Sequence, residues 1–452
     1  MTPGSSSLRF DQGLAALLAA AIALGAAVMT PRVIQDGELY WHIAAGRWMI
    51  ENYAVLRIDP FSYTFTGHPW HTQGWLSQLM LTGAYLATGF SAVIALVALM
   101  TSLAAGALAF ELARFLKGIR LFGALALAFI VAAGAVSARP YLMALPFAIL
   151  YAAGLVRARA DERRPSYWLL ALMLLWANLN TGFLIGLIIT FALGLEAYLK
   201  QRDPAAGRDW LIFSSYALMI SLVTPYGFDG LLHAVRVLLI PADGHVHSVL
   251  PLLLALPAGS VLFVKKKTLI RAALVVLLLV LAVYLPAQQL LFAAMVPLLS
   301  AEALSTGRFE PVLAWRPVAA LVVIALVGLG ARSVLRFDPP DSAVRPATAL
   351  AHVPEAVLRT PVLNEPSFGG YLVSQDVHPF IDSRPIYAHA FRARFAGLGD
   401  AAALDRVTRR YHIRWTILAP ENPAVKTLDG MAGWKRLYTG PNAVVHVKKE
   451  GS

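Results

Sequence analysis

The sequence predicts a polytopic α-helical membrane protein. Hydrophobic residues make up 58% of its 452 positions, whereas charged residues make up only 14%. Soluble domains carry about 25% charged residues, and apolar blocks of about 20 residues are typical of helices that span a bilayer. These two observations exclude a soluble enzyme, a disordered chain and a fibre.

Charge and proline delimit the apolar blocks, and about eleven of them predict membrane spans. The predicted spans lie near residues 13–30, 90–113, 120–137, 140–157, 167–180, 182–199, 210–224, 248–264, 268–284, 287–303 and 315–332. The first block lacks a cleavage pattern, so it predicts a retained helix and not a signal peptide. The stretch 74–88 either extends the second helix or forms a short extra span, which leaves twelve or thirteen as alternatives. The stretch 227–240 either spans or lies along the membrane surface.

The distribution of basic residues predicts the orientation. The formal net charge is +12. Sixteen Lys and Arg residues fall in one alternating set of segments, 114–120, 157–164, 200–209, 265–271 and 304–316, whereas the opposite short loops hold only Arg139 and Arg236. Basic loops face the cytoplasm. We therefore expect no nucleic-acid partner, a cytoplasmic N-terminus, and periplasmic positions for the loop 31–73 and the C-terminal region.

The first outer loop contains most of the acidic and histidine side chains that can take part in catalysis. Asp36 precedes a predicted interfacial helix, in which Glu38 and His42 are spaced to share one face. The run Asp59-Pro60-Phe61-Ser62-Tyr63-Thr64 follows, and then His68-Pro69-Trp70-His71-Thr72-Gln73-Gly74-Trp75. The chain has no cysteine. Disulfides and thiolate metal sites are therefore excluded.

This layout resembles a family of bacterial integral-membrane glycosyltransferases of the GT-C class, which includes the dolichyl-phosphate-mannose mannosyltransferase-like and aminoarabinose transferases. The resemblance rests on one span followed by an outer loop that opens with an acid, on the Asp-x(5)-His helix, and on Asp-Pro-Phe-Ser-Tyr-Thr. Further matching segments are Arg139-Pro140, 176–182, 364–371 and Ile381-Asp382-Ser383-Arg384. It implies a GT-C-like fold in the bacterial inner membrane, a polyprenyl-phosphate-linked sugar donor, and an acidic base at Asp36.

The proposed catalytic residues are Asp36, His42 and Asp59, and each has a structural alternative. A carboxylate can take the proton of a hydroxyl acceptor, because the hydroxyl alone is a poor nucleophile. Asp36 is either this base or only a helix cap. His42 assists phosphate binding, or positions Asp36, or only bonds a backbone carbonyl at the interface. Asp59 is either a second acid of the site or a turn-forming residue before Pro60.

The substrate-binding candidates are polar residues of the outer loop and of the outer ends of the spans: Glu38, Arg47, His71, Arg139, Asn178, Asn180 and Gln288. Arg139 either binds the donor phosphate or is a helix-end arginine. Asn178 and Asn180 either bond sugar hydroxyls or join helices. Gln288 stands where the resemblance implies a phosphate-binding arginine. Asp36 and Glu38 alone are too few ligands for a firm Mg²⁺ or Mn²⁺ site, so we expect metal-independent activity, with a divalent cation as the alternative.

The C-terminal residues predict a small periplasmic α/β domain. We take 1–332 as the membrane catalytic domain, 333–352 as a linker and 353–452 as the outer domain. The expected strands are Ala356–Leu363, Gly370–Ser374, Phe380–Asp382, Trp415–Leu418 and Ala443–Val447, and the expected helix is Ala401–Tyr411. Asp382 and Arg384 either reach the site or form a local ion pair. This domain either guides the acceptor or covers the site.

The sequence therefore predicts an inverting membrane glycosyltransferase that uses a polyprenyl-phosphate sugar. Its acceptor is a lipid, a glycan or a protein on the periplasmic side, and membrane lipids surround it. The alternatives are a glycan polymerase or ligase with a lipid-diphosphate donor, and a transporter or flippase for lipid-linked sugar.

Overall fold

A computed structural model describes residues 3–30, 34–70, 74–201, 204–239, 248–264, 269–305, 315–384, 395 and 397–449. The chain forms two compact units. The helical unit comprises Met1–Val33, Thr72–Ser77 and Ala87–Arg336. The mixed unit comprises Ile34–His71, Gln78–Leu86 and Phe337–Ser452.

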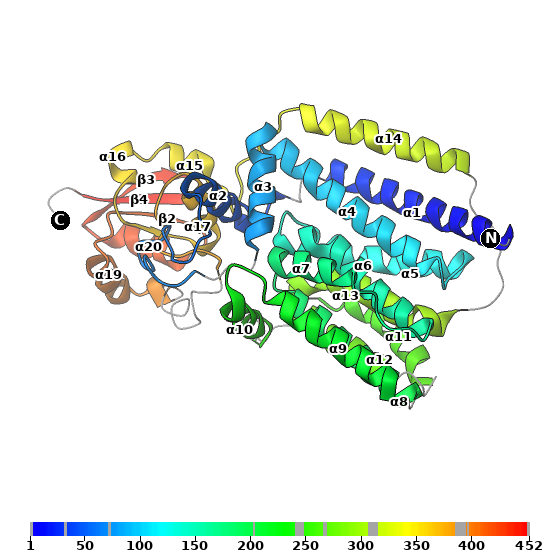
Figure 1. Cartoon of the computed structure of the whole chain (residues 1–452). Coiled ribbons are helices and arrows are strands. Elements are labelled where there is room, and N and C mark those ends of the chain that lie inside the picture. The colour runs from blue at the N-terminus through cyan, green and yellow to red at the C-terminus, as the bar shows by residue number, and fades with distance from the viewer. Residues whose placement is uncertain are drawn as a thin grey trace. The chain divides into compact units, whose positions relative to one another are not determined.

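Every apolar block of the sequence forms a helix in the helical unit (Figure 1). These helices are α1 (Pro3–Met29), α4 (Phe90–Leu112), α5 (Gly118–Ala133), α6 (Pro140–Ala160), α7 (Leu169–Leu179), α8 (Phe183–Gln201), α9 (Pro204–Ser221), α11 (Pro251–Val264), α12 (Leu269–Tyr284), α13 (Gln289–Leu304) and α14 (Trp315–Val334). A short 3₁₀ turn, η3 (Pro286–Gln288), precedes α13. The predicted helix positions are confirmed. Most ends differ by a few residues, but α1 begins ten residues and α9 six residues before the predicted bounds.

Five described helices are long and apolar enough to cross a membrane: Phe10–Met29, Phe90–Leu112, Pro140–Ala160, Phe183–Lys200 and Trp315–Val334. Five shorter apolar helices of 10–17 residues accompany them. The chain is therefore a multi-pass membrane protein. The total of eleven spans and the orientation stay predictions.

Two further helices occupy the stretches that the sequence left open. The first, α3 (Trp75–Thr88), is a separate helix, because Gly89 breaks it from α4 with a left-handed φ of 72°. The second, α10 (Gly227–Leu239), places polar and apolar residues on opposite faces, the pattern of a helix that lies along an interface.

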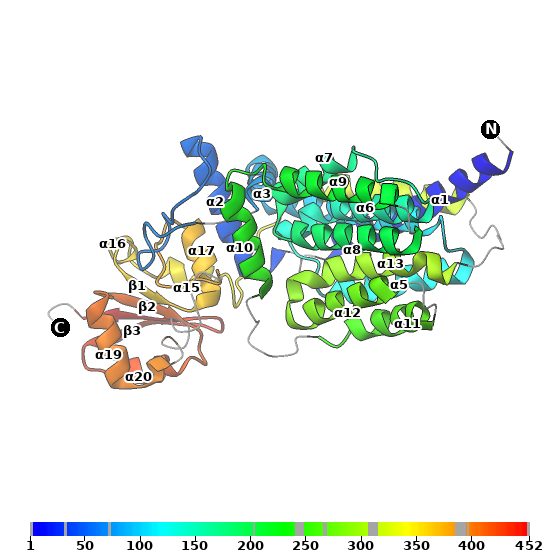
Figure 2. The ribbon, with the colours of Figure 1, turned by 60° about the horizontal axis from the view of Figure 1, so that its bottom comes forward.

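Small residues let α1 approach its neighbours in the helical unit. Buried Ala19 and Ala23 of α1 pack with Ala105 and Ala109 of α4. A second alanine-rich cluster joins α1 and α4 to α14. Close packing through small side chains is the usual way in which helices associate in a membrane. In Figure 2, α6, α8 and α13 run alongside one another.

The mixed unit is built on a four-stranded sheet in the order β1-β2-β4-β3. The strands are β1 (Val362–Asn364), β2 (Trp415–Leu418), β3 (Trp434–Thr439) and β4 (Val444–Lys448). Strands β1 and β2 are parallel, whereas β2 with β4 and β3 with β4 are antiparallel. The helices of this unit are α2 (Gly37–Asn52), α15 (Ala347–Ala351), α16 (Glu355–Leu358), α17 (Gly369–Ser374), α19 (Ala401–Arg410) and α20 (Pro423–Gly430). Two 3₁₀ turns, η4 (Pro366–Phe368) and η5 (Gly397–Gly399), complete it.

Several sequence predictions for the C-terminal region are wrong. Gly370–Ser374 lies in helix α17 and not in a strand, because the 3₁₀ turn η4 leads directly into a helical turn. Phe380–Asp382 forms no strand, since the Asn364 side chain bonds the backbone of this segment in place of a neighbouring strand. Strand β3 and helix α20 were not predicted. Strands β2 and β4 and helix α19 are confirmed.

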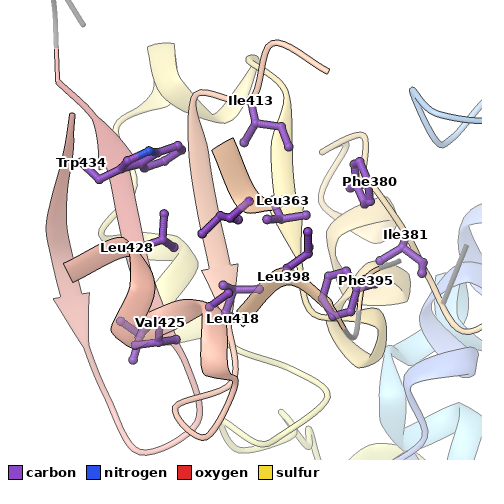
Figure 3. Packing of buried hydrophobic residues seen from close by; sticks show 13 residues of the cluster. Leu363, Phe380, Ile381, Phe395, Leu398, Ile413, Leu418, Val425, Leu428 and Trp434 are labelled. Atoms are coloured by element: carbon purple, nitrogen blue, oxygen red, sulfur yellow. The ribbon is translucent and has the colours of Figure 1, made fainter. Parts of the chain in front are cut away.

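The core of the mixed unit lies between the sheet and its helices. Figure 3 shows Leu363, Leu418, Val425, Leu428 and Trp434 packed together in this core. Tyr63 and Phe65 of the first loop pack against the same cluster. The Tyr63 hydroxyl donates to the Val362 carbonyl at 2.8 Å, and Thr64 donates to the Phe380 carbonyl at 2.7 Å. The first loop is thus an integral part of this unit.

Candidate functional site

Asp36 is the N-cap of α2, as its position before an amphipathic run predicts. Its Oδ1 accepts the Glu38 backbone N–H at 3.0 Å, and its side chain is partly exposed. A carboxylate at a helix N-terminus is stabilised by the unpaired N–H groups and by the helix dipole. The helix therefore fixes the carboxylate in place while part of it remains accessible.

Glycines allow this end of α2 to approach α17 closely. A Cβ added at Gly37 would meet the Ser367 carbonyl oxygen at 2.9 Å, and one added at Gly370 would meet the Gly37 carbonyl oxygen at 2.1 Å. No larger residue fits at Gly370 without moving one backbone segment from the other. The position of Asp36 thus depends on the close contact between Gly37 and Gly370.

His42 is buried inside the mixed unit. Only 4% of its surface is exposed, and its ring lies against Trp41 with centroids 3.7 Å apart. Its Nδ1 lies 3.2 Å from Nε2 of Gln78, a fully buried residue of α3. A hydrogen bond between these two side chains joins α2 to α3 inside this unit. The partner Gln78 was not predicted, since nothing in the sequence links positions 42 and 78.

Asp59 is held far more completely than Asp36. Its side chain is 1% exposed. Oδ1 accepts the backbone N–H groups of Phe61 at 2.8 Å and Ser62 at 3.3 Å, and Oδ2 accepts the Ser62 hydroxyl at 2.8 Å. Arg384 adds an ion pair to Oδ2 at 3.0 Å. This is the Asx-type turn that an Asp before Pro60 favours, with a buried charge partner added.

Arg384 joins two carboxylates and an aromatic ring. Its Nε donates to Oδ1 of Asp382 at 2.8 Å and to Oδ2 at 2.7 Å, so the expected local ion pair is confirmed. Its guanidinium carbon also lies 4.2 Å from the centroid of the Trp70 ring, within the range of a cation–π interaction. The sequence could not show that Arg384 and Asp59, more than 300 positions apart, form one buried cluster.

Two tyrosines frame the N-terminal part of α2. Tyr40 and Tyr371 meet edge to face with ring centroids 5.3 Å apart. Burial raises the pKa of both hydroxyls, against the opposing effect of the Arg345 charge. Both groups therefore stay protonated at neutral pH and provide O–H donors, not negative charge, beside α2.

The remaining candidates in the first loop are less defined by contacts. Arg47 lies in the third turn of α2 and is half-buried, and Glu38 lies in its first turn. His71 lies outside the described residues. Among the residues that the structure describes, no group of three or more His, Asp and Glu side chains is placed to hold a metal ion. Metal independence stays a prediction.

The other candidates belong to the helical unit. The Asn178 Oδ1 accepts from the Trp75 indole at 2.8 Å, and its Nδ2 donates to the Leu174 and Val223 carbonyls at 2.9 and 3.0 Å. The Asn180 Oδ1 accepts from the Trp176 indole at 3.1 Å and from the Gly182 N–H at 2.7 Å. Both amides therefore join helices and turns within this unit.

Arg139 and Gln288 occupy helix starts in the same unit. Arg139 is the N-cap residue of α6, before Pro140, and is half-buried. Gln288 precedes α13 and is 4% exposed, and its Oε1 has no hydrogen-bond partner in the described part of the chain. A buried amide oxygen without a donor is uncommon in folded proteins. The substrate-binding roles of these residues stay predictions.

No protein-family model matches the sequence. A comparison with curated proteins also finds no match. Among solved structures, the fold is similar to the crystal structure of the oligosaccharyltransferase of Archaeoglobus fulgidus in its apo form, with a TM-score of 0.36 and 12% sequence identity. The match covers 90% of this chain and 69% of that chain. A likeness at this level is distant, and it assigns neither substrates nor catalytic residues.

Proposed function

We propose that this membrane protein is a glycosyltransferase that moves a sugar from a polyprenyl-phosphate donor to an acceptor on the periplasmic side. Asp36 is the general base. The proposal rests on the sequence resemblance, on the multi-pass helical fold, and on the way in which the two aspartates of the first loop are held. Asp36 follows the last residue of α1 by seven positions, so it is close in sequence to a candidate span.

The contrast between Asp36 and Asp59 is the observation that carries the assignment of the base. A general base must reach the proton of its substrate, so its carboxylate has to be accessible at the site. Asp36 is partly exposed and anchored by a helix N-terminus. Asp59 is 1% exposed, and both of its oxygens accept bonds from within the mixed unit. We therefore assign the proton transfer to Asp36 and a structural role to Asp59.

The reaction follows from this assignment. Asp36 takes the proton of an acceptor hydroxyl, and the acceptor oxygen attacks the anomeric carbon of the sugar. The bond between that carbon and the phosphate oxygen breaks, and the polyprenyl phosphate leaves with the bonding electrons. A single displacement of this kind inverts the anomeric configuration. The phosphate is a competent leaving group, so proton removal from the acceptor is the main task of the protein.

Reconstitution into vesicles tests the proposed function. The purified protein is given a polyprenyl-phosphate sugar with a radiolabelled sugar, together with a candidate hydroxyl acceptor. Transfer of label to the acceptor that is lost in Asp36→Asn supports the enzyme. Movement of labelled lipid between leaflets without transfer, unchanged in Asp36→Asn, would support a flippase and contradict the proposal. A donor that works only as the diphosphate would support the polymerase or ligase alternative.

The proposed orientation has its own test. Because the chain has no cysteine, single cysteines can be introduced without background. Cysteine at the exposed positions Arg164 and His352 should differ in labelling by a membrane-impermeant thiol reagent added to the periplasmic side. We expect labelling at 352 and none at 164, and the opposite pattern would reverse the topology.

A further inference from the structure

Four helices of the helical unit meet at a cluster of buried charges. Arg271 of α12 donates from Nε and Nη2 to the Glu196 carboxylate of α8 at 2.8 and 3.1 Å. Its Nη1 donates to Glu302 of α13 at 2.8 Å. Lys200 contacts Glu196 at 3.1 Å, and Arg159 of α6 approaches Glu196 at 3.6 Å. The proposed sugar transfer uses none of these residues.

Arg159 is the poorly satisfied member of this cluster. It is 4% exposed, and its Nε and Nη1 are buried without a hydrogen-bond partner in the described part of the chain. The carboxylate nearest to it, Glu196, already accepts two bonds from Arg271. A buried guanidinium without full pairing destabilises the fold, because its N–H groups have lost water and need an acceptor. An anion at Arg159 would supply one.

The charges around Arg159 also favour an anion. Among the described residues, the cluster holds three basic groups, Arg159, Lys200 and Arg271, against the carboxylates of Glu196 and Glu302. The ion pairs beside it, Arg157 with Glu111 and Arg114 with Asp161, are neutral in themselves. One positive charge is therefore left over in the cluster.

The cluster reaches the surface of the helical unit at two of its members. The side chain of Lys200 is 32% exposed, and that of Glu302 is 43% exposed. Lys200 carries its ammonium group at this exposed edge, 3.1 Å from Glu196, the carboxylate that Arg159 approaches. Basic sites between membrane helices at the level of the headgroups are known binding places for anionic lipid headgroups.

We infer that Arg159 and Lys200 form a binding site for a phosphate group, and that an anionic phospholipid headgroup supplies it. The phosphate oxygens accept from the buried N–H groups of Arg159 in charge-assisted bonds. Lys200 provides the second contact at the exposed edge. Arg271 holds α8, α12 and α13 together around the site. The inference is independent of the proposed sugar transfer.

Native mass spectrometry of the full-length protein tests this site. The detergent-purified protein is mixed with equal amounts of phosphatidylglycerol and phosphatidylcholine of the same chain length, and retained lipid is measured. We expect phosphatidylglycerol to be retained in preference. Arg159→Gln should weaken its apparent affinity roughly tenfold to a hundredfold, as the loss of bonds to a charged group predicts. Arg164→Gln, on the exposed segment after α6, removes the same charge and should leave retention unchanged.

Two further arms complete the test. Lys200→Gln should weaken retention of phosphatidylglycerol by a smaller factor than Arg159→Gln. It is the variant to test if Arg159→Gln does not fold. If the wild type shows no preference between the two lipids, but inorganic phosphate lowers the amount of lipid retained, the site binds phosphate. Its phosphate then comes from solution and not from a lipid headgroup. Equal retention of both lipids by the wild type, with no effect of phosphate, would overturn the inference. The inference would also be overturned if the Arg159→Gln variant folds and retains phosphatidylglycerol as the wild type does. The labelled-sugar assay distinguishes these results from failure of the transferase proposal.

Discussion

The two acidic regions of the first loop differ in what their carboxylates bind. At the start of the loop, Asp36 caps α2 and stays partly exposed. In the middle of the loop, Asp59 is 1% exposed and is bonded by Phe61, Ser62 and Arg384. The same residue type is thus a helix N-cap in one place and a buried, ion-paired turn residue in the other.

Only one of the two carboxylates is placed to reach a substrate. A buried carboxylate that is bonded at both oxygens holds its segment in place, and it cannot reach a substrate without breaking those bonds. A helix cap that stays partly exposed, as Asp36 does, can be reached by a substrate. We therefore expect substitution of Asp36 to lower turnover and substitution of Asp59 to lower stability.

The largest expected effect is on sugar transfer by Asp36→Asn. Asparagine still caps the helix but cannot take a proton, so transfer should fall by roughly 10²–10⁴-fold. The melting temperature should stay near that of the wild type. Glu51→Gln removes one charge at an exposed position in the last turn of the same helix and should keep most activity. Equal losses in both variants would show that the charge of the loop matters more than one base.

The next effect is on stability in Asp59→Asn. This change leaves Arg384 buried with one carboxylate instead of two, and it should cost about 3 kcal/mol, the low end of the range for broken buried pairs. Thermal unfolding and hydrogen exchange at the Phe61 and Ser62 amides measure the loss. Asp405→Asn breaks an exposed pair with Arg409 and should cost less than about 1 kcal/mol. Similar costs at both sites would contradict the contrast between the loop regions.

A smaller effect is expected where α17 meets α2. In Gly370→Ala the new Cβ would meet the Gly37 carbonyl oxygen at 2.1 Å, so the helices must separate. Overpacking of this kind costs about 1–3 kcal/mol, and displacement of α2 should also lower transfer. At Gly397 an added Cβ meets no atom within 4 Å, so Gly397→Ala is the matched control. If neither variant changes stability or transfer, the position of Asp36 does not depend on the contact between Gly37 and Gly370.

The smallest effect concerns acid stability of the mixed unit, away from both aspartates. Burial lowers the pKa of His446 from 6.5, although Asp429 accepts from it at 2.9 Å. Hydrogen bonds from Arg436 and His446 lower the pKa of Asp429 from 3.8. The unfolded chain binds protons more readily at both sites, so stability falls as the pH drops below about 6.5 and again near 3.8.

Melting temperatures between pH 7 and pH 5 check the first part of this acid limb. In His446→Gln the melting temperature should fall less between pH 7 and pH 5. In His412→Gln, a change at an exposed position, the fall should be the same as in the wild type. An unaltered pH profile in His446→Gln would assign the acid sensitivity to other groups.

Patterns within one segment were readable from the sequence. Apolar blocks gave the helices, and the residue types around Asp36 gave its cap. Pairings between distant segments were not readable: Arg384 with Asp59, Gln78 with His42, and the cluster around Arg271. The strand error at Gly370–Ser374 has the same cause, because an apolar run of five residues does not distinguish a strand from a buried helical turn.

The most direct test of the central claim is a single-turnover experiment with Asp36→Asn. Labelled polyprenyl-phosphate sugar is bound first, its affinity is measured, and acceptor is then added in excess. The account predicts donor affinity close to that of the wild type and transfer from the bound donor at least about a hundredfold slower. Transfer from the bound donor at more than about a third of the wild-type rate, far above the loss for a missing base, would show that Asp36 is not the base.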